Sequence, residues 1–362
     1  MHAARLSKAL TERTGAQLFG LGTGAMRQAG VELIGDASEI AVIGLSEALE
    51  MLPRAWKLLG RLETEAARRR PRLAILVDSP DFNLRLGPRL KRLGIPIVYF
   101  IAPQAWAWRS GRVRQIRQIV ERMLVIFPFE EKFYRDAGIA AEFVGHPLCD
   151  AVKPHAPSEE FYRRWALDPA RPVLALLPGS RRKELAHNLP AIMEAAQLLA
   201  SNGVPHQSLL AAAPGLAASD FLPYLSQSPG MRLVEGATYD ALAAAQCAVV
   251  SSGTATVESA LLGTPMVVVY RVSATSAFLL RRLVHTPYFS MVNLLLERRA
   301  VPELIQQDFT AERVALEIRR LLDRPEDRER MKGALAEVRS RLASPSPAGA
   351  IGRSVEIISG LL

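Results

Sequence analysis

Short apolar runs, each followed by a stretch long enough for a helix, recur along nearly the whole sequence. A strand that is apolar at every position is buried on both faces, and a helix after it brings the chain back to begin a parallel neighbour. Strands are expected over residues 73–77, 96–101, 123–126 and 141–144, and then over 173–177, 208–213, 231–234, 248–251 and 266–270. The pattern therefore predicts an α/β protein with two doubly wound parallel sheets.

A proline-rich, polar segment separates the two series of strands. It contains Lys153-Pro154-His155-Ala156-Pro157, and punctuation of this kind marks a linker between domains. A chain of 362 residues is also long enough for two α/β domains. We therefore expect Rossmann-like domains over residues 1–152 and 153–340, facing a cleft. Residues 341–362 are expected to form a helical tail that can pack back on the first domain.

The beginning of the sequence departs from this pattern. A Rossmann-like domain normally opens with a strand and a glycine-rich turn. Residues 1–10, MHAARLSKAL, predict an amphipathic helix instead, and no strand precedes it. The first strand of the N-terminal domain is therefore expected to be missing.

The charge of the chain favours anionic partners. The net charge is +9 and the isoelectric point is about 9.9, which suits phosphorylated substrates, an acidic membrane surface or nucleic acid. The arginines are dispersed, and no helix-turn-helix, RNA-binding or zinc-finger signature accompanies them, so nucleic acid is not expected.

The cellular compartment is indicated by the cysteine spacing and by the lack of a long apolar segment. The two cysteines, Cys149 and Cys247, are far apart, which fits neither a disulfide framework nor a zinc site and suits a reducing cytosol. No apolar run approaches the roughly 18 to 20 residues of a membrane span, and the opening residues do not form a signal peptide. The expected location is cytoplasmic, with binding to a membrane surface left open.

Two turns of the predicted second domain have the composition of an anion site. Leu177-Pro178-Gly179-Ser180-Arg181 and Ser251-Ser252-Gly253-Thr254 each lie where a strand ends and a helix begins. Backbone N–H groups and the helix dipole can hold a phosphate there, and Arg181 can add a charge-assisted contact. Glu258 follows in the first helical turns, where a carboxylate can bind a ribose diol. The alternative is a pair of ordinary capped turns, but two in one domain favour a nucleotide site.

Acidic side chains follow the predicted strand at 73–77. Carboxylates at the carboxyl end of a parallel strand lie where ligands bind in open α/β sheets. Asp81 can therefore act as a general base and Asn83 can orient a hydroxyl, although an Asp beside Pro80 also suits a simple turn. Asp78 and Asp81 do not form the D-x-D pair of a metal-dependent transferase, and no metal or cofactor is expected.

Aromatic and basic residues gather after the strand at 96–101. Trp106 and Trp108 can form a wall for an acyl chain or a sugar, although core packing is the more common role of tryptophan. His146, at the end of the strand at 141–144, can line the cleft or be structural. Residues 48–62 mix apolar and basic side chains, which suits either a membrane interface or an ordinary amphipathic helix.

Taken together, the motifs resemble those of the lipid-A-disaccharide synthase family. The resemblance extends from residues 19–22 to Gln306. Its most specific parts are SPDFN at 79–83, APQAWAW at 102–108, FPFE at 127–130, GHPL at 145–148, LPGSR at 177–181, SGTATVE at 252–258, PMVVVYR at 265–271 and VPELIQ at 301–306. One such motif would be weak, whereas this many in order is specific.

The resemblance implies a GT-B-type fold and an inverting, metal-independent transfer. The donor would be UDP-2,3-diacylglucosamine and the acceptor 2,3-diacylglucosamine 1-phosphate. The products would be the β-1,6 lipid A disaccharide 1-phosphate and UDP, formed at the cytoplasmic face of the inner membrane. A homodimer is a further expectation.

The resemblance also assigns site residues. Asp81 would be the general base. The acceptor would be bound by Asn83, Gln104, Trp106, Trp108 and His146. The UDP-sugar would be bound by Gly179, Ser180, Arg181, Ser252, Gly253, Thr254, Glu258, Asn293 and Gln306.

One family feature is lacking, because members open with a strand and a Gly-Glu-x-Ser-Gly-Asp turn. Residues 1–6 align just after that turn, so we expect the numbering to start at an internal methionine and the native mass to exceed 39.6 kDa.

Two alternatives remain at the level of the sequence. One is another GT-B-like enzyme acting on UDP-N-acetylglucosamine, such as a peptidoglycan transferase or an epimerase. The other is a non-catalytic UDP- or lipid-binding protein that lost activity with its first strand. A dehydrogenase is not favoured, because Gly20-Leu21-Gly22-Thr23-Gly24 lacks the G-x-G-x-x-G spacing.

Overall fold

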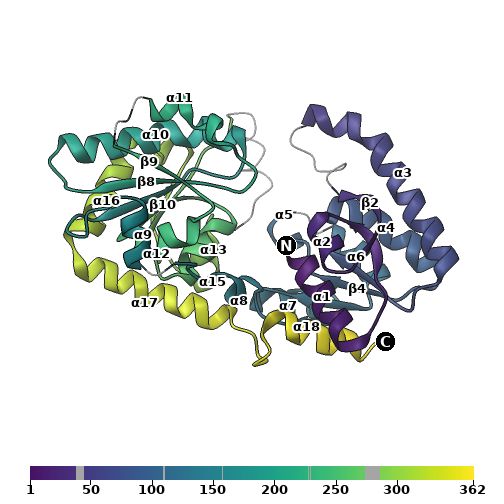
Figure 1. Cartoon of the computed structure of the whole chain (residues 1–362). Coiled ribbons are helices and arrows are strands. Elements are labelled where there is room, and N and C mark those ends of the chain that lie inside the picture. The colour runs from purple at the N-terminus through teal and green to yellow at the C-terminus, as the bar shows by residue number, and fades with distance from the viewer. Residues whose placement is uncertain (38–44, 109–110, 157, 227, 229, 274–285) are drawn as a thin grey trace. The chain divides into compact units, whose positions relative to one another are not determined.

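The computed structural model describes residues 1–37, 45–108, 111–156, 158–226, 228, 230–273 and 286–362, except for the side chains of residues 45–52 and 107–108. The chain divides into two compact units (Figure 1). The first contains residues 1–149 and 342–362, and the second contains residues 150–341. Each unit has its own parallel sheet.

The second unit is built on a six-stranded sheet in which all neighbouring strands are parallel. Its strands are β7 Val173–Leu177, β8 Gln207–Ala212, β9 Arg232–Glu235, β10 Cys247–Ser251, β11 Met266–Tyr270 and β12 Glu303–Ile305. The order β12-β11-β10-β7-β8-β9 is that of a doubly wound Rossmann fold, with the strand order reversing between β7 and β10. Every residue of these two central strands is buried, which explains why they are apolar apart from Ser251 at the end of β10.

Helices cover this sheet. They are α9 Ser158–Arg164, α10 Arg182–Ser201, α11 Leu222–Leu225, α12 Thr238–Ala244, α13 Thr254–Leu261, α15 Met291–Leu296, α16 Ala311–Asp323 and α17 Pro325–Leu342, with 3₁₀ turns η2 Ala218–Asp220 and η3 Gln306–Asp308. Helices α10 and α16 pack against each other, as do α9 and α12. Covering helices of this kind are what the continuous apolar strands predicted.

The first unit contains a four-stranded parallel sheet whose strands lie in chain order. They are β3 Ala74–Val77, β4 Ile97–Phe100, β5 Arg122–Val125 and β6 Ala141–Phe143. A separate parallel pair is formed by β1 Phe19–Gly22 and β2 Glu32–Asp36. The helices are α1 His2–Thr14, α2 Gly24–Gln28, α3 Leu45–Arg69, α4 Pro80–Arg92, α5 Ala105–Trp108, α6 Arg112–Ile119, α7 Pro128–Asp136 and, at the boundary, α8 Leu148–Ala151.

Strands β1, β2 and β12 were not predicted. The sequences of β1 and β2, FGLG and ELIGD, contain glycine and charged residues and are only partly buried, so they lack the apolar signature of a central strand. Strand β12 has three residues, too few for a periodic signal.

Helix α3 is long but amphipathic, in keeping with the core-helix alternative for residues 48–62, although part of that segment lies outside the described side chains. Within the described ranges, none of the helices combines the length and the apolarity needed to cross a membrane.

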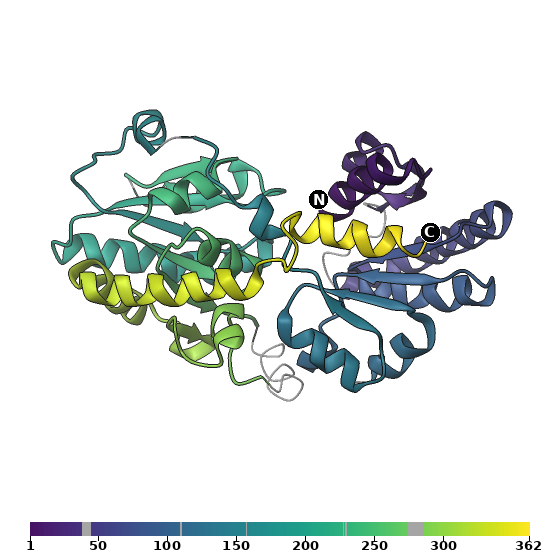
Figure 2. The same ribbon diagram turned by 90° about the horizontal axis from the view of Figure 1, so that it is seen from below.

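The C-terminal segment returns to the first unit. Helix α18, Gly349–Ser359, packs against α1, as both views show (Figures 1 and 2). Arg353 of this helix forms an ion pair with Glu142, and the backbone N–H of His146 donates to the carbonyl of Leu342 at 2.8 Å. The last residues are therefore part of the packing of the first unit.

Replacing Gly145 by alanine should destabilise the first unit. Gly145 has φ +91°, and a Cβ there would lie 2.5 Å from the Cα of Ser344. The left-handed backbone and the steric clash together should lower the free energy of unfolding by about 2 kcal/mol or more. Urea unfolding measures the change. The control is Gly60→Ala inside α3, where a Cβ meets no atom within 4 Å and should stabilise the helix by about 1 kcal/mol. Equal urea midpoints for Gly145→Ala and the native protein would refute the close contact.

Candidate functional site

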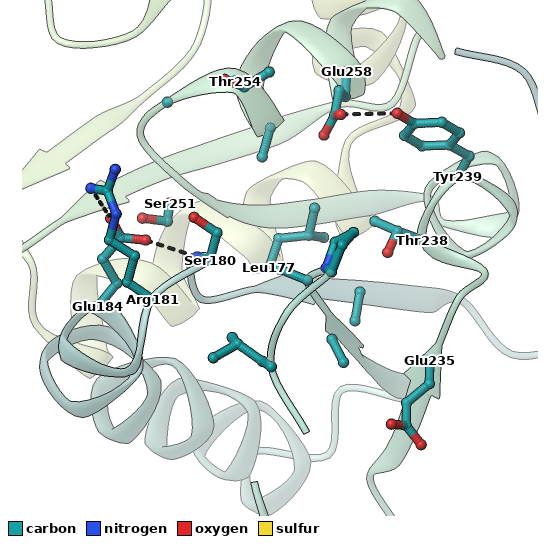
Figure 3. A pocket seen from close by; sticks show the side chains of 18 of the residues that line it. Leu177, Ser180, Arg181, Glu184, Glu235, Thr238, Tyr239, Ser251, Thr254 and Glu258 are labelled. Atoms are coloured by element: carbon teal, nitrogen blue, oxygen red, sulfur yellow. Dashed lines mark hydrogen bonds and ion pairs between the residues drawn. The ribbon is translucent and has the colours of Figure 1, made fainter. Parts of the chain in front are cut away.

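A cavity of about 760 Å³ lies at the carboxyl ends of the strands in the second unit (Figure 3). Leu177 and Ser251, the last residues of β7 and β10, both line it. These are the two strands between which the strand order reverses, and ligands of open α/β sheets bind at this point. Seven of the residues predicted to bind the UDP-sugar line the cavity: Gly179, Ser180, Arg181, Ser252, Gly253, Thr254 and Glu258.

The turn after β7 is shaped around an anion. Gly179 has φ +132°, and a Cβ there would lie 2.5 Å from a carboxylate oxygen of Glu184, so only glycine fits. The backbone N–H of Ser180 donates to Glu184 Oε2 at 2.8 Å, and the Arg181 guanidinium lies 3.4 Å from the same carboxylate. The turn at the beginning of α10 therefore already holds one negatively charged group.

The turn after β10 is open toward the cavity. Gly253 has φ +143°, and a Cβ built there would meet no atom within 4 Å. Ser252 donates its hydroxyl to the carbonyl of Phe289 at 2.8 Å, and Thr256 donates to the carbonyl of Gly253 at 2.7 Å. These bonds fix the turn at the beginning of α13 and leave space for a ligand beside its backbone.

A carboxyl–phenol pair forms another wall of the cavity. Glu258 of α13 accepts a hydrogen bond from the hydroxyl of Tyr239 of α12 at 2.9 Å (Figure 3). Burial raises the pKa of Glu258, and the Tyr239 hydrogen bond opposes part of that shift. The ring of Tyr239 stacks on that of His155, with centroids 6.0 Å apart.

The sequence did not single out Tyr239 or His155 as cavity residues. Tyr239 follows β9, and His155 belongs to the segment read as a linker. The rule that parallel strands end at one edge would have found Tyr239, since residues after the predicted strand at 231–234 belong to that edge.

Two of the predicted donor contacts do not line the cavity. Asn293 is fully buried; its amide donates to the carbonyl of Val301 at 2.9 Å and accepts from the N–H groups of Ala300 and Val301. The side-chain amide of Gln306 lies 3.2 Å from the backbone N–H and carbonyl of Val272. Direct contact of either residue with UDP stays a prediction.

The strand ends around the cavity are tied together by Asn188 of α10. Its amide nitrogen donates to the carbonyl of Pro178 at 2.9 Å and to the hydroxyl of Ser251 at 3.2 Å. Its amide oxygen accepts from the N–H of Arg271 at 3.1 Å. One fully buried side chain thereby joins the ends of β7, β10 and β11.

In the first unit, the segment after β3 carries Asp81 on an exposed helix turn. The side chain of Asp81 is 78% exposed and forms an ion pair with Arg112 of α6. Asn83 is buried and donates to the carbonyls of Val77 and Asp78 at 3.1 and 2.7 Å, so its amide locks this turn. Asp78 and Ser79 both have positive φ, 47° and 43°. Two consecutive non-glycine residues in this region indicate a strained turn of the kind found at functional sites.

The other predicted acceptor residues have different surroundings. Gln104 is exposed, whereas the indole nitrogen of Trp106 donates to Glu130 at 3.0 Å. His146 is buried, which lowers its pKa to about 3, and its Nδ1 accepts from the N–H of Leu148 at 3.2 Å. His146 is therefore a neutral, internally bonded side chain. The side chain of Trp108 lies outside the described residues.

Known structures share this architecture. A calicheamicin glycosyltransferase superposes with a TM-score of 0.63 and 16% identity, over 99% of this chain and 94% of that chain. A UDP-GlcNAc 2-epimerase from Neisseria meningitidis bound to UDP-GlcNAc gives 0.62 and 11%, over 99% and 96%. These similarities show the fold, and with it the class: a protein of the GT-B type, with Rossmann-like domains.

Sequence comparison gives the family. Residues 1–343 match the family described as Lipid-A-disaccharide synthetase. The lipid-A-disaccharide synthase of Anaeromyxobacter dehalogenans strain 2CP-C is 44% identical, over 100% of this chain and 94% of the relative. That of Solibacter usitatus is also 44% identical, over 96% and 90%. The chain belongs to the lipid-A-disaccharide synthase family and is a glycosyltransferase of lipid A biosynthesis. The resemblance noted in the motifs is thereby confirmed.

Proposed function

We propose that the donor is UDP-2,3-diacylglucosamine and that the acceptor is 2,3-diacylglucosamine 1-phosphate. The observation that carries the donor assignment is the cavity at the reversal of strand order, with a helix beginning at each of its two turns. A diphosphate has the charge and size that such turns bind. The products are the β-1,6 lipid A disaccharide 1-phosphate and UDP.

In this proposal the UDP moiety lies on the second unit. Its diphosphate contacts the turns at 179–181 and 252–254, where it takes the place of the Glu184 carboxylate at the N–H of Ser180. Its ribose diol is bound by the carboxylate of Glu258, which Tyr239 orients. Arg181 and the helix N-termini then stabilise the charge that develops on the departing UDP.

The first unit supplies the base and binds the acceptor. Asp81 takes the proton of the acceptor's 6-hydroxyl group. The hydroxyl oxygen attacks the anomeric carbon of the donor sugar on the face opposite UDP, which inverts that centre. Gln104 contacts the acceptor from the segment before α5, and Trp106 and Trp108 do so from α5 itself.

We further propose that the reaction takes place at the cytoplasmic face of the inner membrane, because both substrates carry acyl chains. A tryptophan that is 51% exposed, Trp56 of α3, supports this, because the guanidinium groups of Arg85 and Arg89 lie 5.9 and 5.2 Å from its ring. Such a cluster suits a surface of apolar chains and phosphate groups. The homodimer expected from the family stays a prediction, which light scattering of the pure protein tests.

The decisive assay measures UDP release by the purified chain in mixed micelles. Both lipid substrates are supplied together, and a parallel reaction omits the acceptor. We expect release that requires the acceptor. Release without the acceptor, or conversion of UDP-N-acetylglucosamine with a water-soluble acceptor, would overturn the proposal in favour of another UDP-sugar enzyme. UDP binding without turnover would favour a non-catalytic protein.

Replacing Glu258 by glutamine should weaken UDP binding through the ribose. A hydrogen bond to a charged group contributes about 1.5–3 kcal/mol, so the dissociation constant should rise by about tenfold or more. Calorimetry with UDP and with its 2′,3′-dideoxy analogue measures the change, and only UDP should be affected. Glu194→Gln, at an exposed position of α10 outside the cavity, is the control. An equal loss of affinity for both nucleotides would show that Glu258 does not bind the ribose diol.

A further inference from the structure

The FPFE motif contributes a buried carboxyl group that takes no part in the chemistry above. Glu130, in the first turn of α7, is 1% exposed. Its Oε1 accepts from the indole N–H of Trp106 at 3.0 Å, and its Oε2 accepts from the backbone N–H of Phe127 at 3.2 Å. A buried carboxylate is tolerated only with such partners. Because both partners are obligate donors, they require two accepting oxygens.

Other contacts attach the segment around Trp106, residues 102–106, to α7. The ring of Trp106 lies edge-on to Phe129, with centroids 4.9 Å apart, and the hydroxyl of Tyr134 donates to the carbonyl of Pro103. The loop over residues 102–106, which runs into the first two residues of the short helix α5, is therefore held at a backbone carbonyl and at the ring of Trp106. Among these contacts, only the one from Trp106 to Glu130 depends on the charge of a side chain.

We propose that Glu130 is a positioning residue of the acceptor site, whose carboxylate holds Trp106, and through it the loop over residues 102–106, in the form that receives an acyl chain of the acceptor. The inference rests on the proposed function, because it is there that Trp106 contacts the acceptor. Glu130 itself is enclosed by protein and acts only through the indole ring.

The hold on Trp106 should depend on pH. Burial raises the pKa of Glu130 to about 7, against the opposing effect of its hydrogen bonds from Trp106 and Phe127. The titratable neighbours stay neutral near this pH: burial raises the pKa of Tyr134 and of Tyr99, and lowers that of His146, which lies against Phe127, to about 3. A protonated carboxyl has one strong acceptor left for two donors. As the pH falls through about 7, the bond to Trp106 should therefore weaken.

The first test needs no substrate. The indole N–H signal of Trp106 is assigned in the NMR spectrum of the full chain by its absence in Trp106→Phe. We expect it to shift with pH, with a midpoint near 7, and to lose this titration in Glu130→Gln. The matched control is Glu131→Gln on the same helix, whose carboxylate accepts from the N–H of Phe143 at 3.2 Å and should leave the signal unchanged. An indole signal that does not titrate in the native chain would overturn the inference.

The second test is kinetic and uses the transfer reaction. Glu130→Gln should raise the KM for the acceptor about tenfold above pH 7.5, with kcat and the donor KM within about twofold. Trp106→Phe should do the same, and the double variant should be no worse than Trp106→Phe alone. Additive effects of the two substitutions, or a loss in kcat alone, would assign Glu130 a general structural role instead.

If Glu130→Gln does not fold, the pH dependence of the acceptor KM still tests the inference. The native chain should show this dependence, and Trp106→Phe should not. Absence of transfer by the native chain counts against the proposed function, and the NMR titration then judges the inference by itself.

Discussion

Asp81→Asn should lower the rate of transfer by about 10²–10⁴-fold, because asparagine cannot take the proton of the attacking hydroxyl. The dissociation constant for UDP should stay unchanged, since the cavity that we assign to UDP is lined by residues of the second unit. The fold should also be unaffected, because the side chain of Asp81 is largely exposed. Acceptor-dependent UDP release and calorimetric UDP binding measure the two quantities.

The matched control for this variant is Asp136→Asn. Asp136 is an exposed carboxylate of the same unit that forms an ion pair with Lys132 at 2.7 Å, much as Asp81 pairs with Arg112. Its replacement removes an equal charge from a surface helix and should leave transfer unchanged. Full activity in Asp81→Asn would exclude Asp81 as the base and direct attention to Asp78 on the strained turn before it, whose pKa is raised by partial desolvation of the carboxyl group.

Asn188→Leu should have the largest effect on the second unit. The variant keeps a similar volume but removes partners from the carbonyl of Pro178, the hydroxyl of Ser251 and the N–H of Arg271. Leaving buried polar groups unpaired costs about 1–3 kcal/mol each, so the free energy of unfolding should fall by about 3 kcal/mol or more. Thermal unfolding followed by circular dichroism measures it.

The same variant should also weaken UDP binding. Pro178 and Ser251 directly precede the residues of the two turns that we propose to bind the diphosphate, so loosening them disturbs both turns at once. Asn202→Ala, at the exposed end of the same helix, is the control and should change stability by less than about 0.5 kcal/mol. Unchanged stability and unchanged UDP affinity in Asn188→Leu would show that the strand ends hold their positions without this side chain.

The fold was predictable wherever burial leaves a simple pattern in the sequence. Central strands such as β7 and β10 are buried along their whole length and are almost entirely apolar, a pattern that is visible directly in the sequence. The short, partly buried pair β1 and β2 leaves no such pattern. The position of the two turns was predictable for a related reason, because glycine and small hydroxyl residues follow each of these strands and precede a helix.

Side-chain partners could not be predicted from residue type. Asn293 and Asn83 carry amides suited to a sugar hydroxyl, yet backbone groups of the protein already satisfy much of their hydrogen-bonding capacity. Glu130, read within its motif, gives no sign that it is buried, because its donors come from a loop 24 residues earlier and from its own helix cap. Tyr239 and His155 meet only after two distant segments fold. These roles depend on tertiary contacts, which spacing along the chain does not encode.

The return of the last helix to the first unit has a consequence for biosynthesis. A ribosome makes residues 150–341 before it makes α18, whereas α1, which packs against α18, is made before both. Domains usually fold in the order in which they are translated. Here all the strands of the second unit have been synthesised while the first unit still exposes the face of α1 that α18 will cover. The nascent chain must keep that apolar face from other partners until translation reaches α18.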